Sequence, residues 1–272
     1  MESDVDLFSP GLSLWWPLVF AIGGLLLAWE SAAPLRTPLE SKLRHVSMNL
    51  VIFGVNALGL RLVAGGTLLL WSSRIENQAW GLLNHLQLTP VAGIAVSVVL
   101  LDLLYYGIHR LNHRVPFLWR FHRAHHSDLC VDVTTGLRFH LGEVLISTGI
   151  KVVSVLALGI SPVGVLMSEM ALLMSAQFQH SNISLPVFIE RLLRLCVVTP
   201  PMHIVHHSVR LTEQNSNYGT MLSWWDRLFG TYVATVPQDT MTFGLDEYRR
   251  DLGVIEFYRI PLDPPAKTMS AE

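Results

Sequence analysis

The sequence predicts an all-α integral membrane protein, a bundle with four to five membrane-spanning helices. Hydrophobic residues make up 51% of the 272 residues and charged residues only 15%, whereas soluble domains carry about 25% charged residues. The apolar residues gather in five runs, each close to the roughly 20 residues that a helix needs to cross the hydrocarbon core. A third observation concerns the site: ten of the twelve histidines lie between His109 and His207.

The five apolar runs cover residues 12–29, 47–71, 90–108, 143–160 and 162–179. The first has tryptophans at its edges, as spans commonly do. The last two are separated only by the turn residues Gly159–Pro162. Each of these two runs is near the lower length limit for a span, so the pair forms either two full spans or a re-entrant hairpin.

Basic residues predict the orientation of the spans. The N-terminus carries acidic residues and no Lys or Arg before the first run, which is the opposite of a cleavable signal peptide. Basic residues follow the first and third runs: Arg36, Lys42, Arg44, Arg110, Arg114, Arg120 and Arg123. The positive-inside rule then places the N-terminus outside. It places residues 109–142, and everything after about residue 180, in the cytoplasm. All ten clustered histidines therefore lie at one membrane face.

The histidines form a repeated pattern. His109 and His113 make an H-x3-H pair, while His140 and His180 stand alone. Two H-x2-HH groups complete the set: His122, His125 and His126, and then His203, His206 and His207. Positions i, i+3 and i+4 share one face of a helix, so each group can point several imidazoles at one place. One metal ion rarely needs more than four imidazole ligands, so the pattern indicates two metal ions.

The ligand type narrows the choice of metal. No cysteine belongs to these groups, which excludes thiolate zinc sites and iron–sulfur clusters. A nitrogen-rich site with open positions fits redox-active iron that binds dioxygen and attacks unactivated C–H bonds, which abound in membrane lipids. A zinc hydrolase would show a motif such as H-E-x-x-H, which is absent, and a transporter would place histidines along a span. A metal-binding scaffold without turnover stays open, whereas the net charge of −2 gives no case for nucleic acid.

Five motifs carry a resemblance to a known family. They are HRLNH (109–113), LWRFHRAHHSD (118–128), TTGLRFHLGE (134–143), FQHSN (178–182) and MHIVHHS (202–208). Over about residues 45–235 the chain resembles the fatty acid hydroxylase / sterol desaturase superfamily of membrane-bound oxygenases. The resemblance implies a transmembrane bundle capped by a cytosolic helical domain that holds two iron ions (Fe2+). It also implies a lipid substrate (fatty acyl, sterol or related), dioxygen as co-substrate, and hydroxylation or desaturation, with hydroxylation the simpler outcome.

The resemblance assigns metal ligands by position. The matching residues are His109 and His113, then His122, His125 and His126, then His203, His206 and His207, with His180 as an additional ligand. His140 is a ligand or a hydrogen-bonding neighbour of one, and Ser184 stands where some relatives have a further histidine, so nine or ten ligands remain possible. Metal-bound imidazoles usually donate their other N–H to a carboxylate or carbonyl. The polar residues considered for that role, or for orienting a ligand, are Asp102, Asp128, Asp132, Glu143, Asn182, Asn217 and Asp226; Asp102 could instead connect helices.

The expected organisation has three parts. Residues 1–108 form the N-terminal transmembrane helices, and residues 109–235 the histidine-box catalytic region with a transmembrane hairpin at 143–180. Residues 236–272 form a C-terminal segment whose tail, from about Pro261, is expected to be disordered. With no fused redox domain in the sequence, we expect an external electron donor, a ferredoxin or b-type cytochrome with its reductase, docking near Arg114, Arg120 and Arg123. A bacterial inner membrane is the expected location.

Overall fold

Helices make up the regular structure of the described chain. The computed structural model describes residues 15–37, 41–64, 67–234, 236–237 and 241–264. Its longer helices are α2 (Trp15–Ala32), α3 (Lys42–Ala64), α4 (Thr67–Gln78), α5 (Pro90–Arg114), α7 (Leu141–Leu158) and α8 (Pro162–His180). The short α-helices are α6 (Pro116–His122), α9 (Val187–Leu193), α10 (Pro200–His206), α11 (Leu211–Gln214), α12 (Trp224–Leu228) and α13 (Val254–Arg259). Four 3-10 turns join them: η1 (Leu82–His85), η2 (His125–Ser127), η3 (Val133–Leu137) and η5 (Ile260–Leu262).

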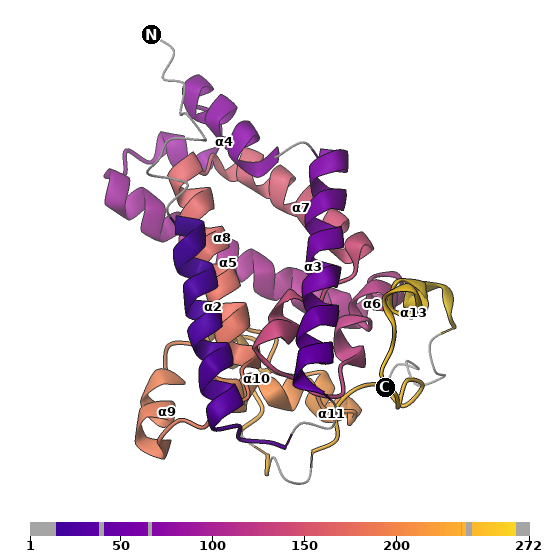
Figure 1. Ribbon diagram of the computed structural model, residues 1–272. Helices are drawn as coiled ribbons and strands as arrows, with labels where there is room; N and C mark the ends of the chain where they lie inside the picture. The colour runs from indigo at the N-terminus through magenta and orange to yellow at the C-terminus, as the bar shows by residue number, and fades with distance from the viewer. Residues whose placement is uncertain (1–14, 38–40, 65–66, 235, 238–240, 265–272) are drawn as a thin grey trace.

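The long helices run along the molecule, and the short ones gather at one end. In Figure 1, α2, α3 and α8 extend through the body, α9, α10 and α11 lie at the lower end, and α4 lies at the upper end. Helix α8 packs on α5, α2, α4 and η3, and α7 packs on α4 and α3. Helix α4 therefore contacts both helices of the α7–α8 hairpin.

Local sequence explains where the central helices begin and end. Helix α5 starts with Pro90 after Thr89, whose side chain accepts a hydrogen bond from the amide of Ala92. Helix α8 starts in the same way, with Ser161 as the cap before Pro162. Helix α7 ends at Gly159, whose φ of 70° lies in the left-handed region that glycine adopts without strain.

Three described helices are long and apolar enough to cross a membrane: Lys42–Val63, Pro90–Arg114 and Leu141–Leu158. A shorter apolar helix covers Pro17–Ala32. Large apolar side chains such as Leu25 and Leu62 remain more than two thirds exposed (71% and 76%), as expected for surfaces that face lipid. The all-helical fold is confirmed, and the chain is a membrane protein; the four to five spans remain a prediction.

Two predicted boundaries differ from the structure. The single run at 47–71 is divided between α3, which ends at Ala64, and α4, which begins at Thr67. The third run extends beyond residue 108, because α5 continues to Arg114 and carries the first two clustered histidines. The expected domain boundary at 108 thus falls inside one helix.

The C-terminal segment is anchored beside the second histidine motif. Ile260 and Phe257 pack with Ile52 and Ala124 in one buried apolar cluster. Arg123 is only 1% exposed and donates hydrogen bonds to the carbonyls of residues 260 and 263. The expectation that Arg123 lies on a docking surface is therefore wrong, because its guanidinium is buried and bonded to backbone carbonyls inside the protein.

The tail expected to be disordered from about Pro261 begins in an ordered turn. Ile260 and Pro261 are buried in η5, and η5 packs on α6. The remainder of that tail, residues 265–272, lies outside the described residues.

Candidate metal centre

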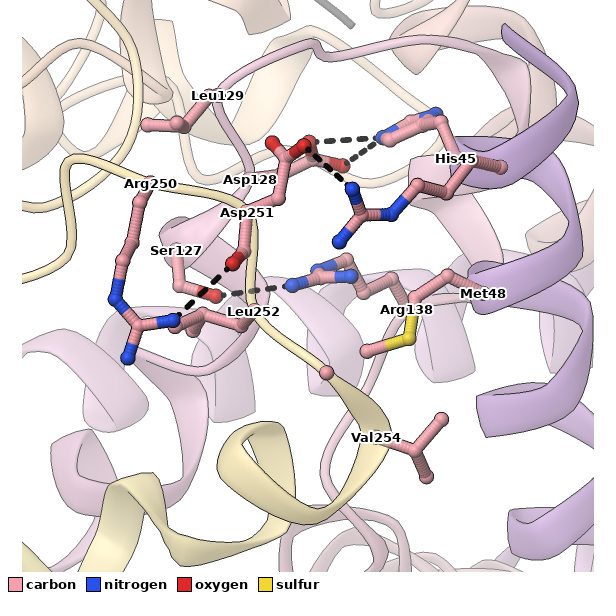
Figure 2. Close-up of a pocket in the computed structure, with 12 residues that line it drawn as sticks. His45, Met48, Ser127, Asp128, Leu129, Arg138, Arg250, Asp251, Leu252 and Val254 are labelled. Atoms are coloured by element: carbon pink, nitrogen blue, oxygen red, sulfur yellow. Dashed lines mark hydrogen bonds and ion pairs between the residues drawn. The ribbon is translucent and has the colours of Figure 1, made fainter. Parts of the chain in front are cut away.

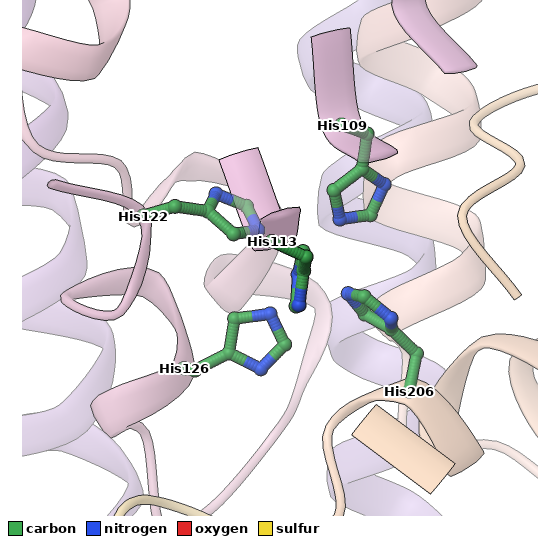
Figure 3. A group of neighbouring side chains, drawn as sticks. All are labelled: His109, His113, His122, His126 and His206. Carbon is green, nitrogen blue, oxygen red and sulfur yellow. The ribbon is translucent and has the colours of Figure 1, made fainter. Parts of the chain in front are cut away.

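Nine of the ten predicted histidines converge on two adjacent groups. The five-histidine group consists of His109, His113, His122, His126 and His206. The four-histidine group consists of His125, His180, His203 and His207. Within each group the candidate ligand nitrogens lie within 4.8 Å of one another, and every side chain is buried. Figure 3 shows the rings of the first group turned toward a common centre, and the stacked rings of His126 and His207, 4.7 Å apart, connect the two groups.

Helix geometry divides each H-x2-HH motif between the groups. Successive residues of an α-helix point about 100° apart, so the two histidines of an HH pair cannot face the same metal. His206 accordingly belongs to the five-histidine group and His207 to the other, while His203, four residues before His207, shares its group. The first motif divides in the same way between His125 and His126, which lie on η2. The repeated motif therefore supplies ligands to both groups.

Five of the histidines have a fixed tautomer. Their Nδ1 atoms each face an oxygen that can only accept a hydrogen bond. The pairs are His109 with Tyr218 O (2.9 Å), His122 with Glu143 Oε1 (2.7 Å), His125 with Arg138 O (3.1 Å), His180 with Ala176 O (2.6 Å) and His206 with Ser216 O (2.8 Å). In the neutral imidazole the proton must then be on Nδ1, which leaves an unprotonated lone pair on Nε2.

The Nε2 atoms of the four-histidine group face one another. The Nε2 atom of His180 lies 3.1 Å from that of His125 and 3.1 Å from that of His203, which is 3.2 Å from that of His207. Since neither His125 nor His180 has a proton on Nε2, their contact brings two lone pairs together, which is unfavourable without a cation between them. Metal–imidazole bonds of about 2.0–2.1 Å separate neighbouring ligand nitrogens by about 3.0–3.4 Å, so the spacing fits one metal ion.

The five-histidine group presents buried nitrogens with no protein partner. Within the described residues, Nε2 of His109, His122 and His206 has no hydrogen-bond partner, and neither ring nitrogen of His113 or His126 has one. Each buried unsatisfied polar atom costs on the order of 1–3 kcal/mol. A metal ion at the centre would satisfy them together, and imidazole ligands suit iron, zinc and copper.

The surroundings keep the imidazoles in the form that binds metal. Burial, reinforced by the neighbouring imidazole of His122, lowers the pKa of His206 to about 3. Burial and adjacent histidines also hold the pKa values of His203 and His207 well below their usual range. These rings are therefore neutral at neutral pH, and metal ligation requires the neutral ring.

A glycine brings His180 to its group. A side chain on Gly136 would lie 2.7 Å from the carbonyl oxygen of Ala176, so η3 can pack directly on α8 only without one. That same carbonyl accepts the Nδ1 hydrogen bond of His180. The loop between the second histidine motif and α7 thereby sets the position of a ligand on α8.

His140 does not join either group. Its Nδ1 accepts a hydrogen bond from the amide of Gly142, which caps the start of α7. Its Nε2 lies 3.3 Å from the carbonyl oxygen of Tyr258 and donates to it. Both ring nitrogens thus have protein partners, and burial lowers the pKa of His140, so the ring is neutral in this role. The structure places His140 as a helix cap apart from the nine.

The hydrogen bonds of Asp102 and Asn217 run to the backbone near the ligands. Asp102 accepts from the amides of Met221 and Leu222 and from the indole of Trp225. Asn217 donates to the carbonyl of Met202, beside His203, and adopts a positive φ of 50°. Both residues hold the segment that supplies the carbonyls of Ser216 and Tyr218 to His206 and His109.

Asp128 and Asn182 connect the centre to α2 and α3. Asp128 accepts from His45 at 2.9 Å and from Thr135 at 2.7 Å. Burial alone would raise the pKa of Asp128, but the charge and hydrogen bond of His45 outweigh it and lower that pKa. The side chain of Asn182 bonds both backbone groups of Arg36, at 2.9 and 2.8 Å. His45 is buried between Asp128 and Asp132.

A separate pocket lies behind η2. Its volume is about 250 Å³, and residues near the start of α3, Ser127 and Asp128 of the second motif, and the segment 250–254 line it. Figure 2 shows His45 hydrogen-bonded to Asp128 in the wall of this pocket, with Arg138 bonded to Ser127. The backbone carbonyl of Arg138 accepts from His125, so a single layer of residues separates this pocket from the four-histidine group.

Sequence reasoning missed the aromatic residues beside the centre. The ring of Tyr218 lies 5.2 Å from that of His113 and 5.6 Å from that of His206. The indole of Trp119 lies 4.9 Å from the ring of His113, and both aromatic residues are buried. Tyr218 follows Asn217 in the sequence and Trp119 lies within LWRFHRAHHSD, but no spacing rule distinguishes either residue from a core residue.

Comparisons with known proteins agree with this geometry. The family model described as fatty acid hydroxylase matches residues 94–231, about half of the chain, which include all nine converging histidines. Similar proteins include the ornithine lipid hydroxylase OlsE of Rhizobium tropici, 32% identical over 51% of this chain and 41% of that protein. A cholesterol 25-hydroxylase-like protein of Danio rerio is 30% identical over 53% of this chain and 57% of its own. The alkylglycerol monooxygenase of Homo sapiens is 31% identical over 53% of this chain and 31% of its own.

The shared region is therefore the part that carries the histidines, and it spans little more than half of these relatives at most. No solved structure matches the chain. The resemblance inferred from the histidine motifs is confirmed by the match over half of the sequence. The chain belongs to the fatty acid hydroxylase family.

Proposed function

We propose that this protein is a membrane-bound di-iron monooxygenase that hydroxylates a C–H bond of a lipid, using dioxygen and electrons from an external donor. One observation carries the proposal: nine buried histidines form two adjacent groups whose unprotonated nitrogens converge. Purely imidazole ligands leave a bound metal positively charged, which suits iron that activates dioxygen. The similar proteins are named as hydroxylases or monooxygenases of ornithine lipid, cholesterol and alkylglycerol.

The protein's own residues have three roles in this function. The nine histidines hold the two ions, which when bound supply the site for dioxygen and its reduction. Glu143 and four backbone carbonyls orient the rings through Nδ1. Trp119 and Tyr218 cover the five-histidine group and keep water away from it.

Substrate access and electron supply follow from the location of the site. The histidines lie at the end of α5 and α8, so a lipid tail can reach them from the bilayer. We propose that this end faces the cytoplasm of a bacterial inner membrane, where a ferredoxin or b-type cytochrome with its reductase supplies electrons. Arg114 and Arg120 are exposed at this end and offer an electrostatic docking contact.

Metal analysis combined with dioxygen consumption tests the proposal. The purified full chain should bind about two iron ions and consume dioxygen only when a reductant is supplied. Cells that express it should contain a lipid heavier by one oxygen than those of cells that lack it, whereas a lipid lighter by two hydrogens would indicate a desaturase. Iron-loaded protein that consumes no dioxygen with any reductant and alters no lipid would contradict the proposal. The matched control is His203→Asn, which removes a ligand and should abolish uptake.

A further inference from the structure

Three polar side chains meet inside the helical bundle, away from the histidines. Tyr105 of α5 donates a hydrogen bond of 2.7 Å to the carboxylate of Glu169 on α8. Lys151 of α7 donates to both oxygens of the same carboxylate, at 2.9 and 3.0 Å. The ammonium group also lies 5.7 Å from the centre of the Tyr105 ring. Charged residues within a membrane-spanning segment are costly and are commonly functional.

The surroundings of this triad are apolar. Tyr105 belongs to the buried cluster that includes Leu101 of α5, Val155 of α7 and Val165 of α8. An ion pair in such a place contributes little net stability, because desolvating two charges offsets their attraction. The triad is therefore poorly explained as a stabilising contact alone.

The triad lies on the membrane side of the metal centre. Tyr105 is one helical turn before His109 on α5, a rise of about 6 Å. Lys151 follows Glu143, the partner of His122, by eight residues on α7, a rise of about 12 Å. A lipid that approaches the histidines from the bilayer must pass this depth.

The two charged groups remain accessible. The side chain of Glu169 is 26% exposed and that of Lys151 13%, whereas Tyr105 is only 5% exposed. Helices α7 and α8 both pack on α4, and the ion pair between Lys151 and Glu169 connects the two helices directly. An ammonium has three N–H donors, of which two point at Glu169, and each carboxylate oxygen has more than one lone pair. Both groups can therefore take a further hydrogen-bonding partner.

We propose that Tyr105, Lys151 and Glu169 bind an uncharged hydrogen-bonding group of the lipid substrate, a hydroxyl, ester or amide. The ion pair has no net charge, so it favours a neutral dipole over a phosphate or carboxylate. Along their helices, Tyr105 lies about 6 Å from His109 and Glu169 about 16 Å from His180, so the triad fixes which carbon of the lipid chain reaches the metal centre. This inference rests on the proposed function, because the triad can determine substrate choice only if the protein oxidises a lipid.

Photoreactive lipids test this binding without any turnover. The probes are a hexadecan-1-ol that carries a mid-chain diazirine and the matched hexadecane without the hydroxyl, applied to the full chain in nanodiscs. We expect the alcohol to label the chain at least about threefold more than the alkane, the preference that one modest hydrogen bond in a membrane gives. Labelled peptides should come from α5, α7 and α8.

The double variant Lys151→Met/Glu169→Leu removes both charges together, so neither remains unpaired. It should label equally with the two probes, and Tyr105→Phe should reduce the preference partially. The control Ser168→Ala changes the neighbouring residue on α8, whose hydroxyl bonds only within its helix, and should keep the full preference.

A double variant that is still labelled more by the alcohol than by the alkane would overturn the inference, whether or not it unfolds at a lower temperature. Equal labelling of the wild type by both probes would also overturn it. Lipid oxidation by that same wild type would show that the proposed function survives. Preferential labelling in a protein that oxidises no lipid would support the polar site while the oxygenase proposal fails.

Discussion

An imidazole binds a metal only through a nitrogen that has a lone pair and no other partner, and this condition separates His180 from His140. Nε2 of His180 faces the other nitrogens of its group. Both nitrogens of His140 are engaged with the backbone. We predict that His180→Asn lowers the metal content from about two ions per chain toward one, whereas His140→Asn keeps both because Asn also caps helices well.

Metal content of the two purified variants, measured by plasma mass spectrometry, checks this difference. The comparison is matched, since both variants replace one buried histidine by the same residue. Loss of one ion from the His140 variant would show that this histidine is a ligand after all.

Glu143 is the only carboxylate among the described residues found bonded to a ring of the two groups. Its Oε1 accepts from His122 and also from Asn112, at 2.7 and 2.9 Å. Replacing this carboxylate leaves His122 less firmly oriented, and such changes typically weaken metal binding about 10- to 100-fold. We predict this loss for Glu143→Gln, measured by competition with a chelator. The control Glu256→Gln, which changes an exposed surface ion pair, should bind metal like the wild type. An unchanged metal affinity of the Glu143→Gln variant would contradict the role assigned to Glu143.

Spacing in the sequence identified the nine converging histidines but not how they are shared. The division of each HH pair depends on which ring lies on which side of a short helix, and η2 is too short to be predicted from hydrophobic periodicity. Four of the five oxygens that orient the rings are backbone carbonyls, as at Ser216 and Tyr218. Backbone atoms have no signature in the sequence, so these contacts become visible only in the fold.

At the scale of elements, the contact between η3 and α8 positions one ligand. A Cβ on Gly136 would lie 2.7–3.1 Å from backbone atoms of Ala176 and Gln177, which cannot move without shifting α8. We predict that Gly136→Ala destabilises the protein by about 1–3 kcal/mol, as overpacking does, and releases the ion of the four-histidine group. Thermal unfolding and metal content measure the two effects.

Gly149→Ala is the matched control for that change. It lies within α7, and an added Cβ would have no heavy atom within 4 Å. Because Ala favours helix more than Gly does, this variant should be neutral or more stable. Equal behaviour of the two alanine variants would mean that the close approach at Gly136 has no consequence.

Apolar runs predicted the positions of the central helices within a few residues, as at α7 and α8. They failed where hydropathy does not change at a helix end. The run at 47–71 stays apolar across the break between Ala64 and Thr67, so hydropathy alone could not reveal two helices, although the Gly-Gly pair at 65–66 is a turn signal in the sequence. Conversely, α5 continues past its apolar part because its last turns face the histidine core instead of lipid.

For the whole molecule, the depth of the α7–α8 hairpin decides the number of spans. Helix α5 has 25 residues, a length of about 37 Å, which exceeds a hydrocarbon core of about 30 Å. The hairpin turn lies at the far end of α5, because Gly159 contacts Gly81 and accepts a bond from Asn84, shortly before that helix begins. Helices α7 and α8 therefore reach as deep as α5 does, which favours two full spans over a re-entrant hairpin.

Thiol labelling from each side of the membrane tests this topology. Cys196 is exposed, on the side of the histidines, and Cys130 can be replaced by Ser to leave it as the single thiol. Val163, just after the turn, is 47% exposed and can carry a single Cys when both native thiols are replaced. We predict that a membrane-impermeant maleimide labels Cys196 only in inverted vesicles and Val163→Cys only in intact cells. Labelling of both sites from one side would require a re-entrant hairpin, because the chain between them would then not cross the membrane.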